Sequence, residues 1–296
     1  DDITCTITNN DNTAHLQLIK TVTNNNGGTA LASAWTLTAD GTGTNDISGA
    51  GGLNQDVNAD TYALSESIGP AGYTAGSFSC VKNGGMPVVG ASITLALGDS
   101  AVCTINNNDI PPKLTLNKIV INDNGGTKTA ADFTLTADGT GTNDLTGTSP
   151  VDSGAGLLAD TWALSETTQY GYSASSWVCV GGTQVGSNIT VGIGGSATCT
   201  ITNDDLPGTI VVIKNARPAQ GSFGFTTTTN DGNNPTLPAY AGFTLTGATT
   251  SNGNMNSQTL DAGTYTVTEG TQLGWILTGI GGSTDPNTPY SCTVTG

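Results

Sequence analysis

The residue types in this sequence that could do chemistry recur once per internal repeat. The chain has only three glutamates, and each ends a similar run: ADTYALSE at Glu66, ADTWALSE at Glu166 and AGTYTVTE at Glu269. Side chains two residues apart in a β-strand point to the same face, so each glutamate shares a face with the apolar residues before it. The same alternation turns one lysine of the first strand and one asparagine of the last strand inward. The resulting candidate sets are Lys20, Glu66 and Asn107; Lys118, Glu166 and Asn203; and Lys214 and Glu269 with Asn9 of a neighbouring copy.

Inward-facing charged groups need a joint explanation, because a buried and unpaired charge costs several kcal/mol. One explanation is a salt bridge between lysine and glutamate, with the asparagine hydrogen-bonded to it. The other is covalent. Burial lowers the pKa of an amine and raises that of a carboxyl group, so a neutral lysine could attack the asparagine side chain while a protonated glutamate relays protons. Ammonia would leave and an isopeptide bond would remain.

The elements that must position these residues are strands of a repeated domain. HLQLIKTVTNNNGG at His15 returns as KLTLNKIVINDNGG at Lys113 and, less closely, as GTIVVIKNARP at Gly208. Each repeat has about seven strand-like runs separated by turn residues, which predicts a β-sandwich. We therefore expect an all-β chain of tandem immunoglobulin-like sandwiches that form a rod. The expected domains are 13–109, 110–206 and 207–296, with residues 1–12 outside them.

Residues 1–12 align with the last strand of a repeat, because CTITN at Cys5 matches CTINN at Cys103 and CTITN at Cys199. The third repeat shows no such strand after Cys292. We expect residues 1–12 of one copy to complete residues 207–296 of the next, since an open sheet edge favours pairing with another strand. The alternative is that the sequence is an excerpt of a longer tandem array.

The cysteines follow the same register. Alignment predicts one disulfide per repeat. An even count without a CxxC motif favours structural disulfides in an oxidising, extracellular setting, with free buried thiols as the alternative. The expected pairs are Cys80 with Cys103, Cys179 with Cys199, and Cys292 with Cys5 of a neighbouring copy.

Composition excludes several classes of protein. Only 10% of the residues are charged and the formal net charge is −16, so the chain cannot neutralise the phosphates of a nucleic acid. A single histidine argues against a transition-metal site. No apolar run has the length of a membrane-spanning helix. We expect no cofactor and no turnover enzyme, because no nucleophile has a histidine nearby and the three glutamates belong to three separate repeats.

The segment LTLNKIVINDNGGTKTAADFTLTADG, followed by TWALSETTQYGY and CTITND, resembles the prealbumin-like domains of bacterial surface proteins, which are related to Cna B-type and SpaA-type pilin domains. The resemblance is close over the first two repeats and loose over the third. It implies that the Lys, Glu and Asn sets form autocatalytic isopeptide crosslinks and that the domains serve as stalks or shafts. Many such domains lack the crosslink or the cysteine pair, and this sequence has no LPxTG-type sorting motif.

Three further features of the sequence are weaker signals for calcium binding, glycosylation and ligand binding. The DGTGTND loops at Asp40 and Asp138, together with Asp-rich junctions, could ligate calcium, although ordinary turn chemistry explains them as well. Asn188 lies in an NIT glycosylation sequon. The third repeat carries longer loops that could bind a ligand. We expect a structural subunit or segment of an extracellular filament or cell-surface stalk whose partners are copies of itself. The alternative is an adhesin whose third-domain loops bind a glycan or protein on a host or other surface.

Overall fold

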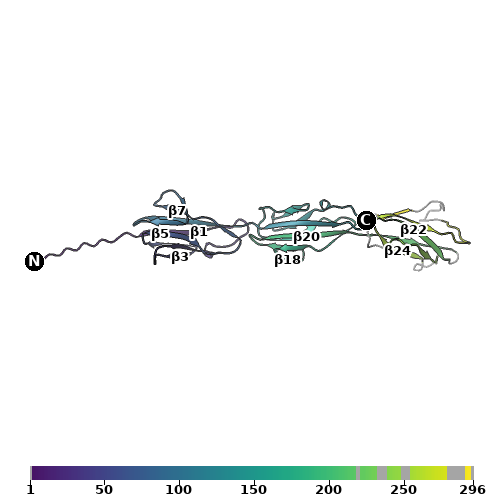
Figure 1. The fold of residues 1–296 in the computed structure, drawn as a ribbon, viewed down its shortest axis with the longest axis horizontal. Coiled ribbons are helices and arrows are strands. Elements are labelled where there is room, and N and C mark those ends of the chain that lie inside the picture. Colours follow the sequence, from purple (N-terminus) through teal and green to yellow (C-terminus); the bar gives the residue numbers. More distant parts are fainter. Residues whose placement is uncertain (1, 218–220, 232–238, 248–253, 279–290, 295–296) are drawn as a thin grey trace.

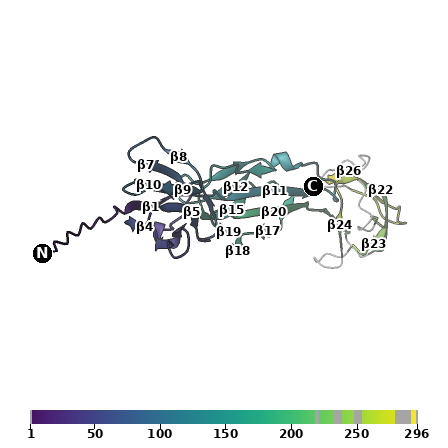
Figure 2. The ribbon, with the colours of Figure 1, turned by 60° about the vertical axis from the view of Figure 1, so that its left-hand side comes forward.

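The computed structural model describes residues 2–217, 221–231, 239–247, 254–278 and 291–294. Within these ranges the regular elements are strands, apart from two single turns of 3-10 helix, η1 (Ala32–Ala34) and η2 (Ala130–Asp132). No helix in this part of the chain is long and apolar enough to cross a membrane. Figures 1 and 2 show three β domains in a line, with an extended N-terminal tail at one end and the third domain at the other. The all-β tandem architecture expected from the sequence is confirmed.

The first domain is a sandwich of two sheets. Its central feature is that the first strand pairs in parallel with the last, so that Lys20 lies opposite Ile105 and Val22 opposite Asn107. One sheet has the order β4 (Gly52–Val57), β1 (Ala14–Thr23), β10 (Ser100–Asp109), β7 (Ser79–Lys82) and β8 (Val88–Val89), with β6 (Tyr73–Ala75) also on β10. The other has the order β3 (Ile47–Ala50), β2 (Thr36–Asp40), β5 (Asp60–Glu66) and β9 (Ser92–Leu95).

The second domain repeats this arrangement, with its first and last strands again parallel. One sheet has the order β14 (Val151–Asp152), β11 (Lys113–Ile121), β20 (Ser196–Asp205) and β16 (Tyr172–Ala174), with β17 (Val178–Gly181) also on β20. The other has the order β13 (Leu145–Gly147), β12 (Leu135–Asp138), β15 (Asp160–Glu166), β19 (Asn188–Val191) and β18 (Thr183–Val185).

The third domain differs at one edge. Its strands are β21 (Gly208–Ile213) paired with β24 (Met255–Leu260), and a sheet of β23 (Phe243–Leu245), β22 (Phe223–Asp231), β25 (Gly263–Glu269) and β26 (Ser291–Val294). Among the described strands, β21 pairs only with β24. The edge at which β1 and β11 each hold a last strand therefore has no partner in the described part of this domain.

The strand that carries Cys292 does not lie where sequence alignment places it. Alignment with Cys80 and Cys179 predicts a position beside a last strand, as in β7 and β17. Instead β26 pairs with β25, and Cys292 lies opposite Tyr265, as Ile93 lies opposite Tyr62 in the first domain. In the described residues β26 therefore occupies the edge of β25 that corresponds to the edge of β5 held by β9 in the first domain.

The cores follow the alternation read from the sequence. In β1 as far as Lys20, and throughout β10, every second residue is buried, and this buried set includes Lys20 and Asn107 as well as Leu18 and Ile105. In the second domain Lys118 and Asn203 are likewise buried. In the third domain the aromatic residues in and next to β22 and β23 pack inward rather than onto the surface: Phe223, Phe225 and Tyr240 are buried, and Phe243 packs against them.

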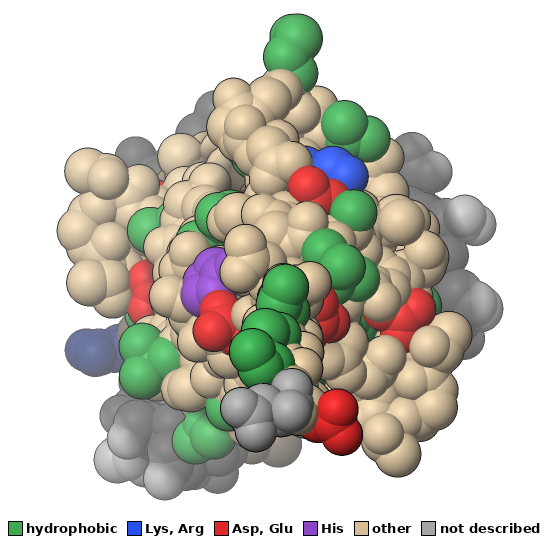
Figure 3. All heavy atoms as spheres, turned by 90° about the vertical axis from the view of Figure 1, so that its left-hand side faces the viewer, with side chains coloured by type: hydrophobic (Ala, Val, Ile, Leu, Met, Phe, Trp, Pro, Cys, Tyr) green, Lys and Arg blue, Asp and Glu red, His purple; other side chains and the backbone are tan. Residues whose placement is uncertain are grey.

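The N-terminal tail belongs to no sheet. Residues 2–13 pair with no strand in the described structure, and they project from the end of the molecule that Figure 3 views. Ile3 and Ile7 are both 87% exposed. They correspond to Ala101 and Ile105 of β10, which are buried in the first domain. The tail thus presents to solvent the apolar face that a last strand buries.

The second domain should lose stability in acid. Burial raises the pKa of Asp160, but hydrogen bonds from Asn143 and from the backbone of Thr140 and Thr161 outweigh it and lower the pKa to about 2. Because the folded pKa lies below the unfolded value, the stabilisation is complete above pH ~4 and is lost as the pH falls through about 2. We expect Asp160→Asn to lower the melting temperature at pH 7 by a few degrees and to flatten its dependence on pH below 5.

The matched control is Asp152→Asn, which alters an exposed carboxylate of the same domain that accepts a hydrogen bond from Thr115. Calorimetry from pH 7 to 2 on the three chains checks the effect. If Asp160→Asn and the wild-type chain melt in parallel over that whole range, this carboxylate does not carry the acid sensitivity.

Candidate functional site

In the first domain the predicted Lys, Glu and Asn meet at one point in the core. The Lys20 Nζ atom lies 2.6 Å from Glu66 Oε2, and Asn107 Nδ2 donates a hydrogen bond of 3.0 Å to Glu66 Oε1. Lys20 comes from β1, Glu66 from β5 and Asn107 from β10, so both sheets contribute. The Lys20 side chain is wholly buried. One carboxyl group therefore contacts the amine and the amide at the same time.

The second domain repeats the ion pair. Lys118 Nζ lies 2.6 Å from Glu166 Oε2, and the lysine side chain is again wholly buried. Asn203 is buried on the neighbouring parallel strand, two positions beyond the residue that faces Lys118. Burial lowers the pKa of the Lys118 amine, and the hydrogen bond and charge of Glu166 oppose this effect only in part. The site thus favours the neutral, nucleophilic form of the amine more than water does.

The asparagine oxygens are a notable feature of both complete sites. Asn107 Oδ1 and Asn203 Oδ1 are buried and accept no hydrogen bond from any described residue. An acceptor left in this state costs about 1–3 kcal/mol. A protonated glutamate could donate to this oxygen during attack on the amide carbon and so stabilise the charge that develops there. The arrangement has the parts needed for isopeptide formation, although a salt bridge with a hydrogen-bonded asparagine uses the same contacts.

The third site contains the lysine and the glutamate but not the asparagine. Lys214 Nζ lies 2.5 Å from Glu269 Oε1, and the two side chains are 13% and 18% exposed. A cavity of about 640 Å³ opens beside them, lined also by Ala216, Phe223 and Trp275. Asn9 remains in the exposed tail of the same chain. The single chain therefore brings Lys214 and Glu269 together and leaves the predicted third member apart from them.

An aromatic ring completes each site, and the sequence analysis missed it. The lysine Nζ atoms lie 4.9 Å from the ring centre of Trp35, 4.3 Å from that of Phe133 and 4.1 Å from that of Phe223. Each ring stands two residues before the residue that pairs with the site glutamate. This constant offset is the signal that could have revealed it. A ring face can hold an ammonium ion, and its apolar surface excludes water from the amine.

A second feature missed in the sequence ties the end of the last strand to the loop after the first. Asp109 accepts hydrogen bonds from the backbone amides of Asn25, Asn26 and Gly28, at 2.8–3.0 Å. Burial raises the Asp109 pKa, but these amides outweigh it and the pKa is lowered. Asp205 makes the same contacts with Asn124 and Gly126. The carboxylate fixes the last strand just beyond the Lys–Glu–Asn site.

Disulfides join the last strand to its other neighbour. Cys80 of β7 is bonded to Cys103 of β10, and Cys179 of β17 to Cys199 of β20, with an S–S length of 2.01 Å in the first pair and 2.07 Å in the second. In both pairs the two cysteines face each other across antiparallel strands. Cys5 is free and exposed. The pairing of Cys5 with Cys292 of another copy stays a prediction.

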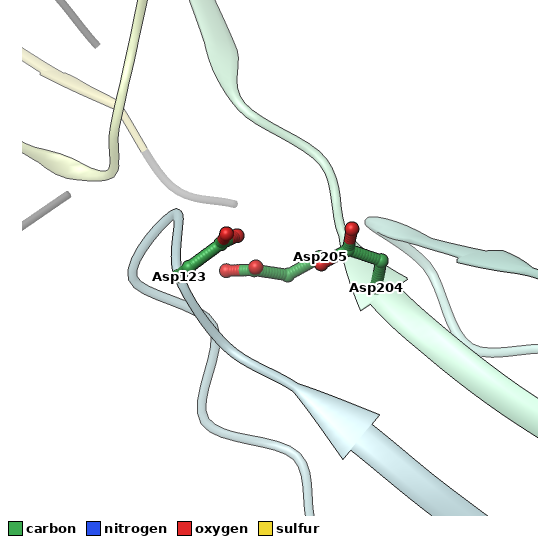
Figure 4. A group of neighbouring side chains, drawn as sticks. All are labelled: Asp123, Asp204 and Asp205. Carbon is green, nitrogen blue, oxygen red and sulfur yellow. The ribbon is translucent and has the colours of Figure 1, made fainter. Parts of the chain in front are cut away.

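Calcium binding also stays a prediction. In the first DGTGTND loop, Asp60 accepts hydrogen bonds from Thr42 and Asn45, which is ordinary turn chemistry. Three other carboxylates, those of Asp123, Asp204 and Asp205, offer oxygens within 4.8 Å of one another. Figure 4 shows Asp123 in the loop after β11 and the other two at the end of β20. Burial and the charges of Asp123 and Asp205 raise the pKa of Asp204.

Two further expectations concern the glycosylation sequon and the longer loops of the third repeat. Asn188 of the glycosylation sequon is exposed on β19, and its modification stays a prediction. The adhesin alternative depends on the longer loops of the third repeat. Of these loops, residues 232–238 and 279–290 lie outside the described residues.

Comparison with known proteins identifies the family of the first two domains. The sequence profile described as "Prealbumin-like fold domain" matches residues 11–105 and again residues 109–201. The chain therefore belongs to the family of prealbumin-like fold domains, with two matched copies in tandem. No curated protein sequence matches the chain.

Several solved structures are similar to it at low sequence identity. The TIE protein of Bacillus anthracis is 14% identical with a TM-score of 0.49, and the alignment covers 96% of this chain and 48% of that protein. The major pilin subunit of Bacillus cereus is 11% identical with a TM-score of 0.32, over 95% of both chains. A major pilin of Streptococcus pyogenes is 13% identical with a TM-score of 0.33, over 66% of this chain and 97% of the pilin. The chain thus spans about half the length of the Bacillus anthracis protein.

Proposed function

We propose that this chain is a structural subunit of an extracellular filament or surface stalk, and that copies assemble head to tail. Residues 2–12 of one copy would lie beside β21 of the next and act as the last strand of its third domain. Lys–Asn isopeptide bonds in all three domains, together with the disulfides of the first two, would then reinforce the filament. The observation that carries this proposal is the match between a last-strand sequence in the tail and an edge of β21 with which no described strand pairs.

The match extends to individual positions. In the register of β10, the tail would turn inward Ile3, Cys5, Ile7, Asn9 and Asp11, the counterparts of five buried residues of the first domain: Ala101, Cys103, Ile105, Asn107 and Asp109. Asn9 would then enter the cavity beside Lys214 and Glu269, where the lysine already lies over Phe223. Burying Ile3 and Ile7 stabilises the assembly by about 1.5–3 kcal/mol each, before the backbone hydrogen bonds are counted.

The covalent step needs no partner beyond the three side chains. The neutral Lys214 amine attacks the Asn9 side-chain carbon, so the Nζ–Cγ bond forms and the Cγ–Nδ2 bond breaks. A proton passes from the lysine nitrogen through Glu269 to the leaving nitrogen, which departs as ammonia. The same step in the first two domains joins β1 to β10 and β11 to β20. A pulling force on the filament would then meet covalent bonds between the first and last strands.

Mass spectrometry of the native protein tests this proposal. We expect a loss of one ammonia for each Lys–Asn pair, and non-reducing digests in which Lys214 of one copy is linked to Asn9 of another. Asn9→Ala is the control: it should abolish the link between copies and leave the losses within the first two domains unchanged. A monomeric chain with unmodified Lys214 would contradict head-to-tail assembly.

A further inference from the structure

The junction between the first and second domains is built around one close contact. Gly72 has φ of +86°, and a Cβ atom on it would lie 2.5 Å from Ile193 Cγ1. Ile193 belongs to the turn before β20, and Gly194 of that turn donates a backbone hydrogen bond of 2.7 Å to Ile110 in the linker. The side chain of the following domain thus sits on a glycine of the preceding one, and the linker fixes its position.

The free end of the first domain has the same parts in the same places. Leu97 takes the position of Ile193, and Gly98 donates to Asn12 at 3.1 Å as Gly194 donates to Ile110. The backbone amide of His15 donates a hydrogen bond of 2.8 Å to the carbonyl of Asp99. In the second domain the amide of Lys113 donates one of 3.0 Å to the carbonyl of Gly195. The tail therefore leaves the first domain along the path that β10 and the linker follow into the second.

The difference is that no described residue covers this end of the first domain. Leu97 is 56% exposed, whereas Ile193 is partly covered at the junction. Ala59 is exposed too. Its counterparts in the other two domains contact the preceding domain: the backbone amide of Ala159 donates to the carbonyl of Asn26, and that of Ala262 to the carbonyl of Asn124, both at 2.9 Å. The end of the molecule seen in Figure 3 is thus a complete junction surface without a partner among the described residues.

The third domain offers the complementary half. Gly274 follows β25 as Gly72 follows β5 and Gly171 follows β15, and the φ angles of the three are +84°, +86° and +81°. A Cβ atom on Gly274 would meet no described atom within 4 Å. The conformation that receives Ile193 at Gly72 is therefore present at Gly274, with the space still open.

We propose that the free end of the first domain, centred on Leu97, docks on Gly274 of a second copy and repeats the internal junction between subunits. This inference rests on the proposed head-to-tail assembly, because the donated tail brings the two surfaces together. It adds that subunits meet as rigidly as domains within a chain do. A filament built this way has no hinge at its subunit boundaries.

Site-specific photo-crosslinking on the full chain tests the contact. A benzophenone side chain at position 97 should crosslink to residues 271–275 of another copy, while a probe at Val185, an exposed residue on β18, should not. In addition, Leu97→Asp should slow assembly on the order of tenfold, the equivalent of losing one buried apolar side chain, and Val185→Asp should leave the rate unchanged.

The outcomes separate this inference from the proposed function. A Lys214–Asn9 link between copies together with a position-97 crosslink near Gly274 supports both. The same link with no crosslink from position 97 to residues 271–275, or with an unchanged assembly rate for Leu97→Asp, overturns the docking contact and leaves strand donation intact. If copies do not exchange strands at all, both are overturned.

Discussion

Replacing Glu166 by glutamine is expected to prevent the proposed isopeptide bond of the second domain from forming. The stability of this domain should then fall by about 4–5 kcal/mol, because the bond would close a loop that spans nearly the whole domain. Glutamine keeps the shape of the side chain but removes the carboxyl group that contacts Lys118 at 2.6 Å. The proton relay is then lost. Intact mass should rise by one ammonia, and calorimetry should show one domain melting earlier.

Asn203→Ala distinguishes an isopeptide bond between Lys118 and Asn203 from a simple salt bridge between Lys118 and Glu166. It keeps the Lys118–Glu166 pair and removes only the carbon that would be attacked. If the bond forms in the wild-type chain, this variant should lose about as much stability as Glu166→Gln. If the site is only an ion pair, it should lose far less, because Asn203 Oδ1 accepts no hydrogen bond from a described residue. Glu66→Gln provides a matched control, since it should affect the mass and melting of the first domain alone.

The site residues could be predicted from the sequence because strand alternation is a local rule. Once Tyr62 and Leu64 are assigned to the core, Glu66 must face it too. The same rule identified Lys20 and Asn107, and the structure brings these three side chains together. The parallel pairing of β1 with β10 could not be predicted from the sequence, because it depends on how two strands that are distant in the chain meet in space.

The features that were missed depend on contacts between elements. Trp35 directly precedes β2, and its position over the Lys20 amine follows from the packing of one sheet on the other. Asp109 looked like part of an Asp-rich junction, and only the fold shows it accepting amides from the loop after β1. The position of Cys292 was wrong because alignment compares residues one by one, whereas a strand pairs with whichever edge is available.

Replacing Ile7 by aspartate is expected to abolish head-to-tail assembly, with a loss of affinity on the order of a thousandfold or more. In the donated strand Ile7 would take the place of Ile105, which is 3% exposed in the first domain. The variant loses the apolar contact and also forces a charge toward the core of the acceptor. Light scattering and the yield of the Lys214–Asn9 link between copies measure the effect.

Thr8→Asp is the matched control for that experiment. It adds the same charge one residue further along the tail, where the counterpart Asn106 faces solvent, so assembly should be nearly unaffected. Neither change should alter the melting of the first two domains, because the tail lies outside their sheets. Equal loss from both variants would indicate that charge alone controls association. Loss from Thr8→Asp only would indicate that the donated strand enters with its opposite face inward, which would carry Asn9 away from Lys214.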